Sequence, residues 1–266
     1  MLPPEFIKAW NIRDYYSTGQ LKSKKNQVFR IRIVEESGQE NLLVLKKFRK
    51  SSNFQKEAVL FSALVEERAP IPEVYYSKND IIIMEYIEGR LLLETLCSKE
   101  SGTFQQLGDA LEKLYRGLAK AFKSGKLKGI SGSQAFSDLN DTLANKNDAL
   151  FHRLECENSA SDMTSLILGD MNLRNFIWQQ DKNKIVRVDL ESVKPGRIAE
   201  DLGQMLAFLI SYNPPFSERK LKTGSSLCDY LANRLTVARE EIKKELRAEL
   251  QVIGSRRGME IPDFVI

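Results

Sequence analysis

The spacing of apolar residues changes once along this chain, and that change limits the folds it can adopt. In about the first ninety residues, short apolar stretches are separated by turn residues, and residues 27–34 alternate apolar with basic side chains. From about residue 104 the spacing becomes helical, first at Leu107, Leu111, Leu114, Leu118 and Phe122. We therefore predict an α+β chain with a strand-rich N-terminal part and a mainly helical remainder.

The individual elements follow from the same patterns. Predicted strands occupy residues 27–34, 42–48, 74–77, 81–87, 165–168, 176–178 and 185–189. Predicted helices occupy residues 52–67, capped by Ser52 or Asn53, then 104–122, 201–210, and a long final helix over 227–250 that Gly254 stops. Residues 134–165 are expected to form short helices with polar connections. The crossover at residues 88–92 predicts two lobes, residues 1–88 and 89–266.

Composition excludes several classes of protein. A chain of 266 residues with 42% hydrophobic and 29% charged residues is long enough for a large core and ordinary for a soluble protein. A net charge of +4 gives no reason to expect nucleic acid as a partner. The apolar runs are too short to span a bilayer, and the N-terminus lacks the pattern of a signal peptide.

Cysteine and histidine usage narrows the chemistry further. The three cysteines are scattered, which indicates reduced thiols and a cytoplasmic protein. His152 is the one histidine, so a zinc site rich in histidine cannot be built. His152 itself is expected to be an ordinary surface or partly buried residue. The sequence does not define the oligomeric state.

Two short segments carry the strongest chemical signal. Asp170 lies in a loop before a predicted strand, Asn175 follows five positions later, and Asp189 ends the next strand. Phosphoryl transfer needs a group that orients the attacking hydroxyl and oxygen ligands that hold Mg²⁺ on the phosphates. Asp170 suits the first role, as a base that accepts the hydroxyl proton, and Asn175 and Asp189 suit the second. Aspartate and asparagine are also ordinary turn residues, but this spacing between strands favours the catalytic interpretation.

The N-terminal part supplies candidates for nucleotide binding. Lys46 ends an apolar strand, where it can reach the phosphates and pair with Glu57 of the following helix. Rival choices for this pair are Lys47 with Glu66 or Glu67.

The apolar strand over residues 81–87 leads into a turn. Its backbone from Glu85 to Ile87 can meet an adenine edge, with Met84 behind it; a plain buried strand fits the pattern equally well. The loop over residues 19–26 is basic but holds a single glycine, so it lacks a glycine-rich phosphate motif.

Taken in order, these residues resemble the aminoglycoside phosphotransferase-like kinases, a branch of the protein-kinase-like fold that includes choline, sugar and homoserine kinases. The resemblance spans about residues 15–212. It is carried by residues 43–46, 54–58, 71–74, 83–89, 169–177 and 188–191, and by residues 201–203. It implies a bilobal fold, ATP between the lobes, Mg²⁺ on Asn175 and Asp189, and Asp170 as the catalytic base. It also implies that Asp201 steadies the catalytic loop.

Departures from the family pattern bear on the activity. Leu168 replaces a frequent histidine, Leu190 replaces the usual phenylalanine, and Glu191 stands where protein kinases carry glycine. These changes, with no Ala-Pro-Glu segment, favour a kinase for a small hydroxyl-bearing molecule or sugar. A protein Ser/Thr kinase and a catalytically silent nucleotide-binding module stay open as alternatives. Residues 90–165 and the last helices are expected to form the acceptor wall, and the basic stretch over residues 113–128 is more simply a solvated helix face.

Overall fold

The computed structural model describes residues 2–97, 103–127 and 165–262. Its N-terminal part is a five-stranded antiparallel sheet in the order β1-β2-β3-β5-β4. The strands are β1 (Ile12–Leu21), β2 (Gln27–Glu35), β3 (Glu40–Lys47), β4 (Val74–Lys78) and β5 (Ile81–Glu85). Two helices accompany the sheet, α1 (Pro4–Ala9) and α2 (Ser51–Glu66).

The two faces of this sheet belong to different parts of the core. Leu43 and Leu45 of β3 lie in a small buried cluster with Phe6 of α1. Val44, between them in sequence, lies in the main cluster with α2. Successive strand residues point to opposite faces, so Lys46, two residues after Val44, is directed to the α2 face. Strand alternation thus places this lysine on the side of the site.

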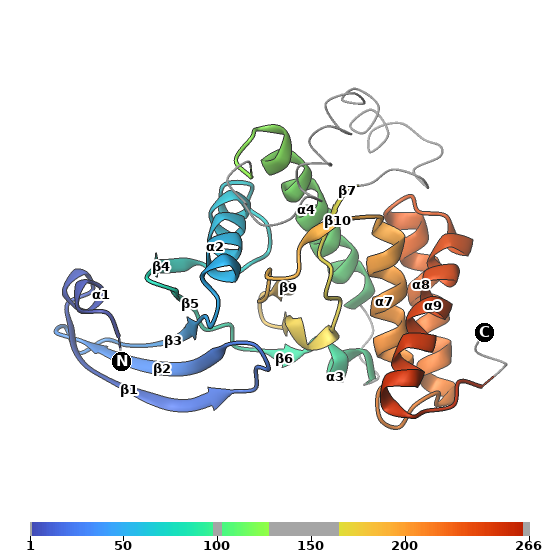
Figure 1. Cartoon of the computed structure of the whole chain (residues 1–266). Coiled ribbons are helices and arrows are strands. Elements are labelled where there is room, and N and C mark those ends of the chain that lie inside the picture. The colour runs from blue at the N-terminus through green and yellow to red at the C-terminus, as the bar shows by residue number, and fades with distance from the viewer. Residues whose placement is uncertain (1, 98–102, 128–164, 263–266) are drawn as a thin grey trace.

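The C-terminal part surrounds two small sheets with helices (Figure 1). The strands pair in the orders β6-β8-β9 and β10-β7. Figure 1 shows α7, α8 and α9 side by side, away from the five-stranded sheet. The elements are β6 (Arg90–Leu91), α3 (Leu92–Cys97), α4 (Thr103–Lys123), β7 (Ser165–Ile167), the 3₁₀ turn η1 (Leu173–Asn175), β8 (Phe176–Gln179), β9 (Lys184–Arg187), β10 (Lys194–Gly196), α7 (Ile198–Ser211), α8 (Glu218–Arg234) and α9 (Arg239–Arg257).

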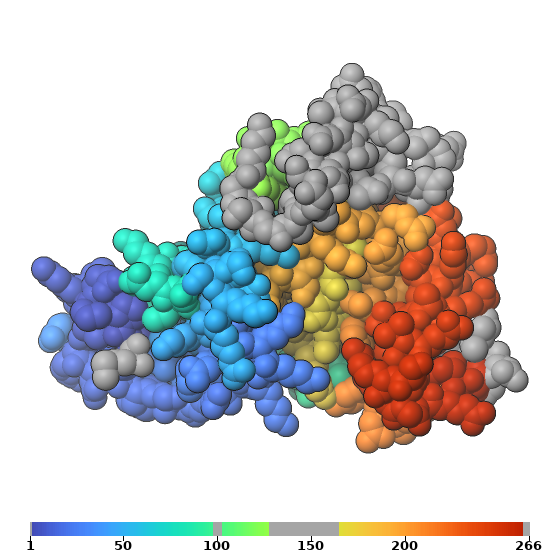
Figure 2. Space-filling model, viewed as in Figure 1, coloured from blue at the N-terminus to red at the C-terminus, as the bar shows by residue number. Residues whose placement is uncertain are grey.

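The main buried cluster runs through both parts of the chain. It includes Leu60 and Leu64 of α2 together with Leu111 and Leu118 of α4. The helices approach closely where Gly117 meets Leu64, since a Cβ there would lie 2.9 Å from a Leu64 methyl carbon. In Figure 2 the light-blue atoms of α2 adjoin the yellow and orange atoms of the C-terminal part. The division at residues 88 and 89 stays a prediction, because no break in the core coincides with it.

Three predictions about the elements were wrong. The single long final helix is two helices, α8 and α9, interrupted near Thr236, whose φ is +52°. The apolar spacing continues across this break, so periodicity did not reveal it. Helix α9 passes through Gly254 and ends at Arg257, and the C-cap residue Gly258 has φ of +61°. Helix α2 begins after Lys50, and neither Ser52 nor Asn53 caps it.

The sequence patterns missed α1 and β1, and also the short elements β6, α3, η1 and β10. β1 is an edge strand whose residues are mostly exposed, so it carries little of the alternation that identifies half-buried strands. Cys97 and Cys228 are free thiols. The expectations for His152, Cys156 and most of residues 134–165 fall outside the described residues. No helix in the described part of the chain combines the length and apolarity needed to cross a membrane.

Candidate active site

A buried ion pair joins the sheet to α2. The Lys46 ammonium Nζ lies 2.6 Å from Oε2 of Glu57 and 3.4 Å from Oδ1 of Asp189. The side chains of Lys46 and Glu57 are 5% and 0% exposed, so this charge pair is dry. Lys46 therefore connects α2 with the segment that follows β9.

The rival residues have other partners. Lys47 is exposed, Glu66 pairs with Lys126, and Glu67 lies 3.7 Å from the Lys120 ammonium. The structure brings together Lys46 and Glu57 and leaves these alternatives at the surface.

The surroundings shift the protonation of both partners. Burial raises the pKa of Glu57 to about 7, although the Lys46 charge opposes this. Burial acts to lower the pKa of Lys46, but the charges of Glu57 and Asp189 outweigh it and the pKa is raised. Lys46 is thus charged at neutral pH, whereas Glu57 gains and loses its proton close to neutral pH.

Asp189 follows β9 and faces the same space. Its Oδ1 accepts a hydrogen bond from the Glu191 backbone N–H at 3.0 Å. Burial acts to raise the pKa of Asp189, yet the Lys46 charge and that N–H lower it, so the carboxylate is ionised. Carboxylate oxygens of Glu57, Asp189 and Glu191 lie within 4.8 Å of one another. Glu57 is buried against Lys46, and both Glu191 oxygens accept hydrogen bonds from asparagine amides, so Asp189, whose side chain is 38% exposed, offers the carboxylate best placed for a cation.

Asn175, the other predicted metal ligand, is placed beside this segment through its backbone. The Val188 N–H donates to the Asn175 carbonyl at 2.9 Å, and β8 and β9 pair from Phe176 and Arg187 onward. The Asn175 side chain is half-buried. The hairpin therefore brings the Asn175 backbone next to Val188, the residue before Asp189, although Asn175 and Asp189 are fourteen positions apart in the sequence.

Glu191 joins three segments and was noted in the sequence only as a departure from a family pattern. Its carboxylate accepts hydrogen bonds from the Asn26 and Asn53 side-chain amides, both at 2.7 Å. The Lys25 ammonium lies 3.5 Å away. Asn26 and Lys25 belong to the glycine-poor loop before β2, and Asn53 lies in α2. The loop is therefore held against the Asp189 segment by Glu191, which lies 165 residues beyond Asn26 in the sequence.

The loop that carries the predicted base Asp170, residues 168–172 and called the catalytic loop below, is held through its backbone. The Asp201 carboxylate accepts from the Leu168 and Gly169 backbone N–H groups at 2.6 and 2.9 Å, and from the Tyr115 hydroxyl at 2.9 Å. Gly169 has φ of +72°, and a Cβ there would lie 2.1 Å from the Ser192 carbonyl oxygen, so this turn requires glycine.

Asp170 follows directly and is half-buried. Its Oδ1 accepts a hydrogen bond from the Asn172 backbone N–H at 3.1 Å.

The backbone around the predicted adenine site leaves the sheet early. β5 ends at Glu85, whose N–H donates to the Glu73 carbonyl at 2.9 Å. The peptide groups of residues 86–88 therefore lie beyond the strand pairing. Met84 pairs with Val44 of β3, and both Met84 and Ile87 are buried.

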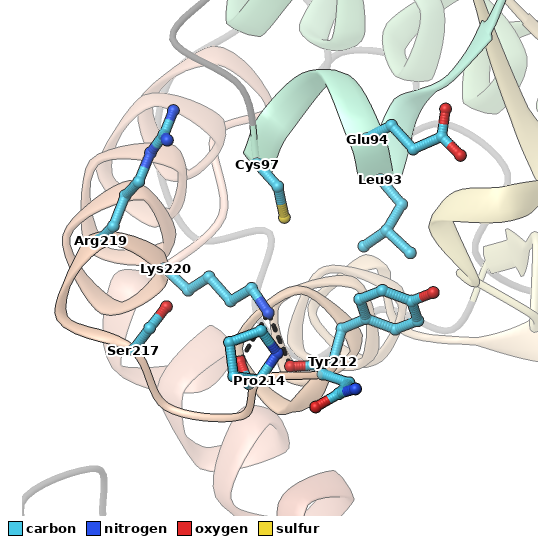
Figure 3. Close-up of a pocket in the computed structure, with 9 residues that line it drawn as sticks. Leu93, Glu94, Cys97, Tyr212, Pro214, Ser217, Arg219 and Lys220 are labelled. Carbon is cyan, nitrogen blue, oxygen red and sulfur yellow. Dashed lines mark hydrogen bonds between the residues drawn. The ribbon is translucent and has the colours of Figure 1, made fainter.

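A cavity of about 300 Å³ lies between α3 and the connection from α7 to α8 (Figure 3). Leu93 and Cys97 line it from α3, and Tyr212 lines it from the other side. The Lys220 ammonium donates to the Tyr212 and Pro214 carbonyls at 2.6 and 2.7 Å, which holds this wall together.

The 3₁₀ turn η1, which follows the catalytic loop, contacts the same wall through Arg174. The Arg174 guanidinium lies 5.0 Å from the centre of the Tyr212 ring and donates to the Tyr212 hydroxyl. No spacing in the sequence marked this cavity, because α3 and the α7–α8 connection are far apart in the chain.

Comparison with solved structures shows the same fold in several kinases. An amicoumacin kinase in complex with AMP-PNP and Ca²⁺ aligns over 97% of this chain and 87% of its own, with 15% identity and a TM-score of 0.58. A choline kinase from Streptococcus pneumoniae aligns over 98% and 92%, with 14% identity and a TM-score of 0.55. A Plasmodium vivax ethanolamine kinase aligns over 99% and 81%, with 15% identity and a TM-score of 0.54. These likenesses confirm the predicted kinase-like α+β fold.

Sequence comparison gives a family but no near relative. The search of curated proteins found no match. Residues 24–229 match the model of the phosphotransferase enzyme family, and since this is most of the chain, the protein belongs to that family.

Proposed function

We propose that this protein is a kinase that uses ATP and Mg²⁺ to phosphorylate a hydroxyl group of a small molecule. The observation that carries the proposal is the position of Lys46, whose ammonium bridges Glu57 of α2 and Asp189 beyond β9. This arrangement orients a buried positive charge beside an ionised acid, as binding of a metal–nucleotide requires. Membership of the phosphotransferase family supports the reaction class.

Each predicted residue takes one role in this proposal. Lys46 binds nucleotide phosphate oxygens, and Glu57 orients Lys46. The backbone from Glu85 to Ile87, with Met84 behind it, meets the adenine. Asn175 and Asp189 hold Mg²⁺, whose hard oxygen preference their side chains fit; the metal would neutralise charge on the phosphates. Asp170 accepts the proton of the attacking hydroxyl.

The acceptor would approach from the C-terminal part. The cavity beside Tyr212 is the best candidate for part of its binding surface, because Arg174 of η1 contacts the same tyrosine. Two of the structural neighbours are an ethanolamine kinase and a choline kinase, which supports a small acceptor.

The basic stretch, described over residues 113–127 of α4 and the turn after it, gives no support for an anionic acceptor. The Arg116 guanidinium lies 2.8 Å from a Glu112 carboxylate oxygen, and Lys126 pairs with Glu66. These ion pairs fit the expected solvated helix face.

The test is a phosphorylation screen of a metabolite library with detection of the added phosphate by mass. We expect one class of hydroxyl-bearing metabolite to be labelled in the presence of ATP and Mg²⁺, and the Asp170→Ala variant to label none. A protein panel serves as the parallel arm. Labelling of proteins but not metabolites would make this a protein kinase. Mg²⁺-dependent binding of ATP without turnover in any arm would make it a nucleotide-binding module.

A further inference from the structure

Arg187 is the bulkiest side chain that the described part of the chain buries completely, with 1% exposure. Arginine is rarely buried unless it is paired, because removing a guanidinium from water is costly. In the described residues Arg187 forms no ion pair, and its Nε has no hydrogen-bond partner. Since no salt bridge within the described ranges compensates for the desolvation of this guanidinium, another set of contacts must explain its position.

The hydrogen bonds of the Arg187 guanidinium all lead to the catalytic loop. Its Nη2 donates to the Asp170 carbonyl at 2.9 Å and approaches the Leu168 carbonyl at 3.5 Å. Its Nη1 lies 3.9 Å from the Met171 sulfur, and its Cζ lies 5.0 Å from the centre of the Phe176 ring. The charge is thus directed at backbone oxygens on both sides of Gly169.

The main chain of Arg187 is itself fixed. Its N–H donates to the Pro70 carbonyl at 2.9 Å, in the connection between α2 and β4. Its Cα pairs with that of Phe176 across the β8–β9 hairpin. A guanidinium mounted on this strand has little freedom to follow a moving loop.

Asp201 holds the same stretch of backbone through its N–H groups, whereas Arg187 holds it through its carbonyl groups. The Asp201 carboxylate accepts from the Leu168 and Gly169 N–H groups, whereas Arg187 donates to the Leu168 and Asp170 carbonyls. Burial lowers the pKa of Arg187 against the opposing attraction of Asp201, Asp189 and Asp170, but a guanidinium stays charged at neutral pH.

We propose that Arg187 is a positioning residue that, opposite Asp201, fixes the backbone of residues 168–170 and thereby aims the Asp170 carboxylate. This inference rests on the proposed role of Asp170 in phosphoryl transfer. It also gives a reason for a buried charge two residues before the metal-binding segment. Arg187 does not touch the nucleotide or the acceptor in this scheme.

The test replaces Arg187 in the full chain and follows both the loop and turnover. Arg187→Met keeps much of the side-chain length but removes the donors, and Arg187→Lys restores one charged donor. Leu250→Ala is the control for general destabilisation, because Leu250 is buried between α7 and α9, away from the loop. Hydrogen–deuterium exchange of residues 168–171 reports loop fixation, and ATP turnover gives kcat and the KM for Mg-ATP.

For Arg187→Met we expect faster exchange in residues 168–171 and a fall in kcat of about a hundredfold, with the KM within about threefold of wild type. Arg187→Lys should recover part of kcat, and Leu250→Ala should lower thermal stability without changing exchange in the loop. If Arg187→Met does not fold, Arg187→Lys carries the comparison with a smaller fall in kcat.

Unchanged exchange and kcat in the folded Arg187 variants would overturn the inference, as would an equal effect of Leu250→Ala on the loop. Absence of turnover in the wild type would overturn the proposed function instead, and the exchange measurement would still decide whether Arg187 fixes the loop.

Discussion

The nucleotide side and the acceptor side of the site are organised differently. On the nucleotide side, Lys46 and Glu57 hold each other through buried side chains of opposite charge. On the acceptor side, the Asp170 side chain is half-buried, and it is the backbone before it that Asp201 and Arg187 fix. In the proposed scheme, the charge that binds phosphate is therefore positioned by its ion pair, whereas the base is positioned by the backbone of the loop that carries it.

The largest expected effect comes from removing the acceptor-side base. Asp170→Ala should lower kcat by roughly 10²–10⁴-fold, the range for loss of a general base, while ATP affinity stays near that of wild type. Steady-state kinetics and a thermal-shift titration with Mg-ATP check the two halves of this expectation. Asp189→Ala is the counterpart on the nucleotide side and should abolish Mg²⁺-dependent binding. Retained turnover in Asp170→Ala would remove Asp170 from its role.

The next effect is a change in the free energy of unfolding with pH, which Glu57 on the nucleotide side should cause. Glu57 binds its proton more tightly folded, with a pKa of about 7, than unfolded, with a pKa of 4.5. Protonated Glu57 therefore makes its whole contribution to the free energy of unfolding below pH 4.5. This contribution, roughly 3 kcal/mol, is lost as the pH rises to about 7. Denaturant unfolding of wild type and Glu57→Gln at pH 5 and pH 8 measures this.

The wild type should lose stability relative to Glu57→Gln over that interval, since the glutamine stays neutral. Parallel pH profiles would show that Glu57 does not titrate there.

A smaller effect is expected from the lysine of the pair. Lys46→Met should lower kcat/KM for Mg-ATP by roughly ten- to a hundredfold, because a charged hydrogen bond to phosphate is lost. The exposed neighbour provides the control, since Lys47→Met changes the same residue type one position along β3 on the other face. Similar losses in both variants would mean that overall charge, and not the buried pair, governs nucleotide binding.

The smallest predicted effect tests the loop that Glu191 holds. Asn26→Ala removes one hydrogen bond of about 1 kcal/mol and should raise the KM for Mg-ATP about fivefold with little change in kcat. Asn41→Ala is the matched control, because the Asn41 amide donates to Glu35 within the sheet. A fall in kcat alone would assign this loop to the acceptor side.

Much of the fold could be predicted because its elements are strongly periodic. Strand β2 and helix α4 bury one regular face, whereas β3 and α7 are apolar runs buried on most sides, and the sequence shows both kinds of pattern. β1 could not be found, since an exposed edge strand needs only a partner for its backbone. The interruption between α8 and α9 depends on local backbone geometry at Thr236, which apolar spacing does not encode.

The candidate site divides in the same way. Lys46, Glu57, Asp170 and Asp189 belong to short segments whose residue types suit one reaction, so they could be named in advance. Glu191 and Arg187 acquire their importance from partners elsewhere in the chain, Asn26 for one and the catalytic-loop carbonyls for the other. Their positions are set by tertiary packing, and no local pattern reports such contacts.

The buried cluster shared by α2 and α4 has a consequence for how this protein can be divided. Cutting the chain at residue 88 would leave Leu60 and Leu64 on one fragment and Leu111 and Leu118 on the other, each facing water. Neither piece would be expected to survive alone in a cell, but the two produced together have complementary apolar surfaces that can reassemble. A cut at residue 88 is thus a natural way to split this enzyme into a two-component reporter.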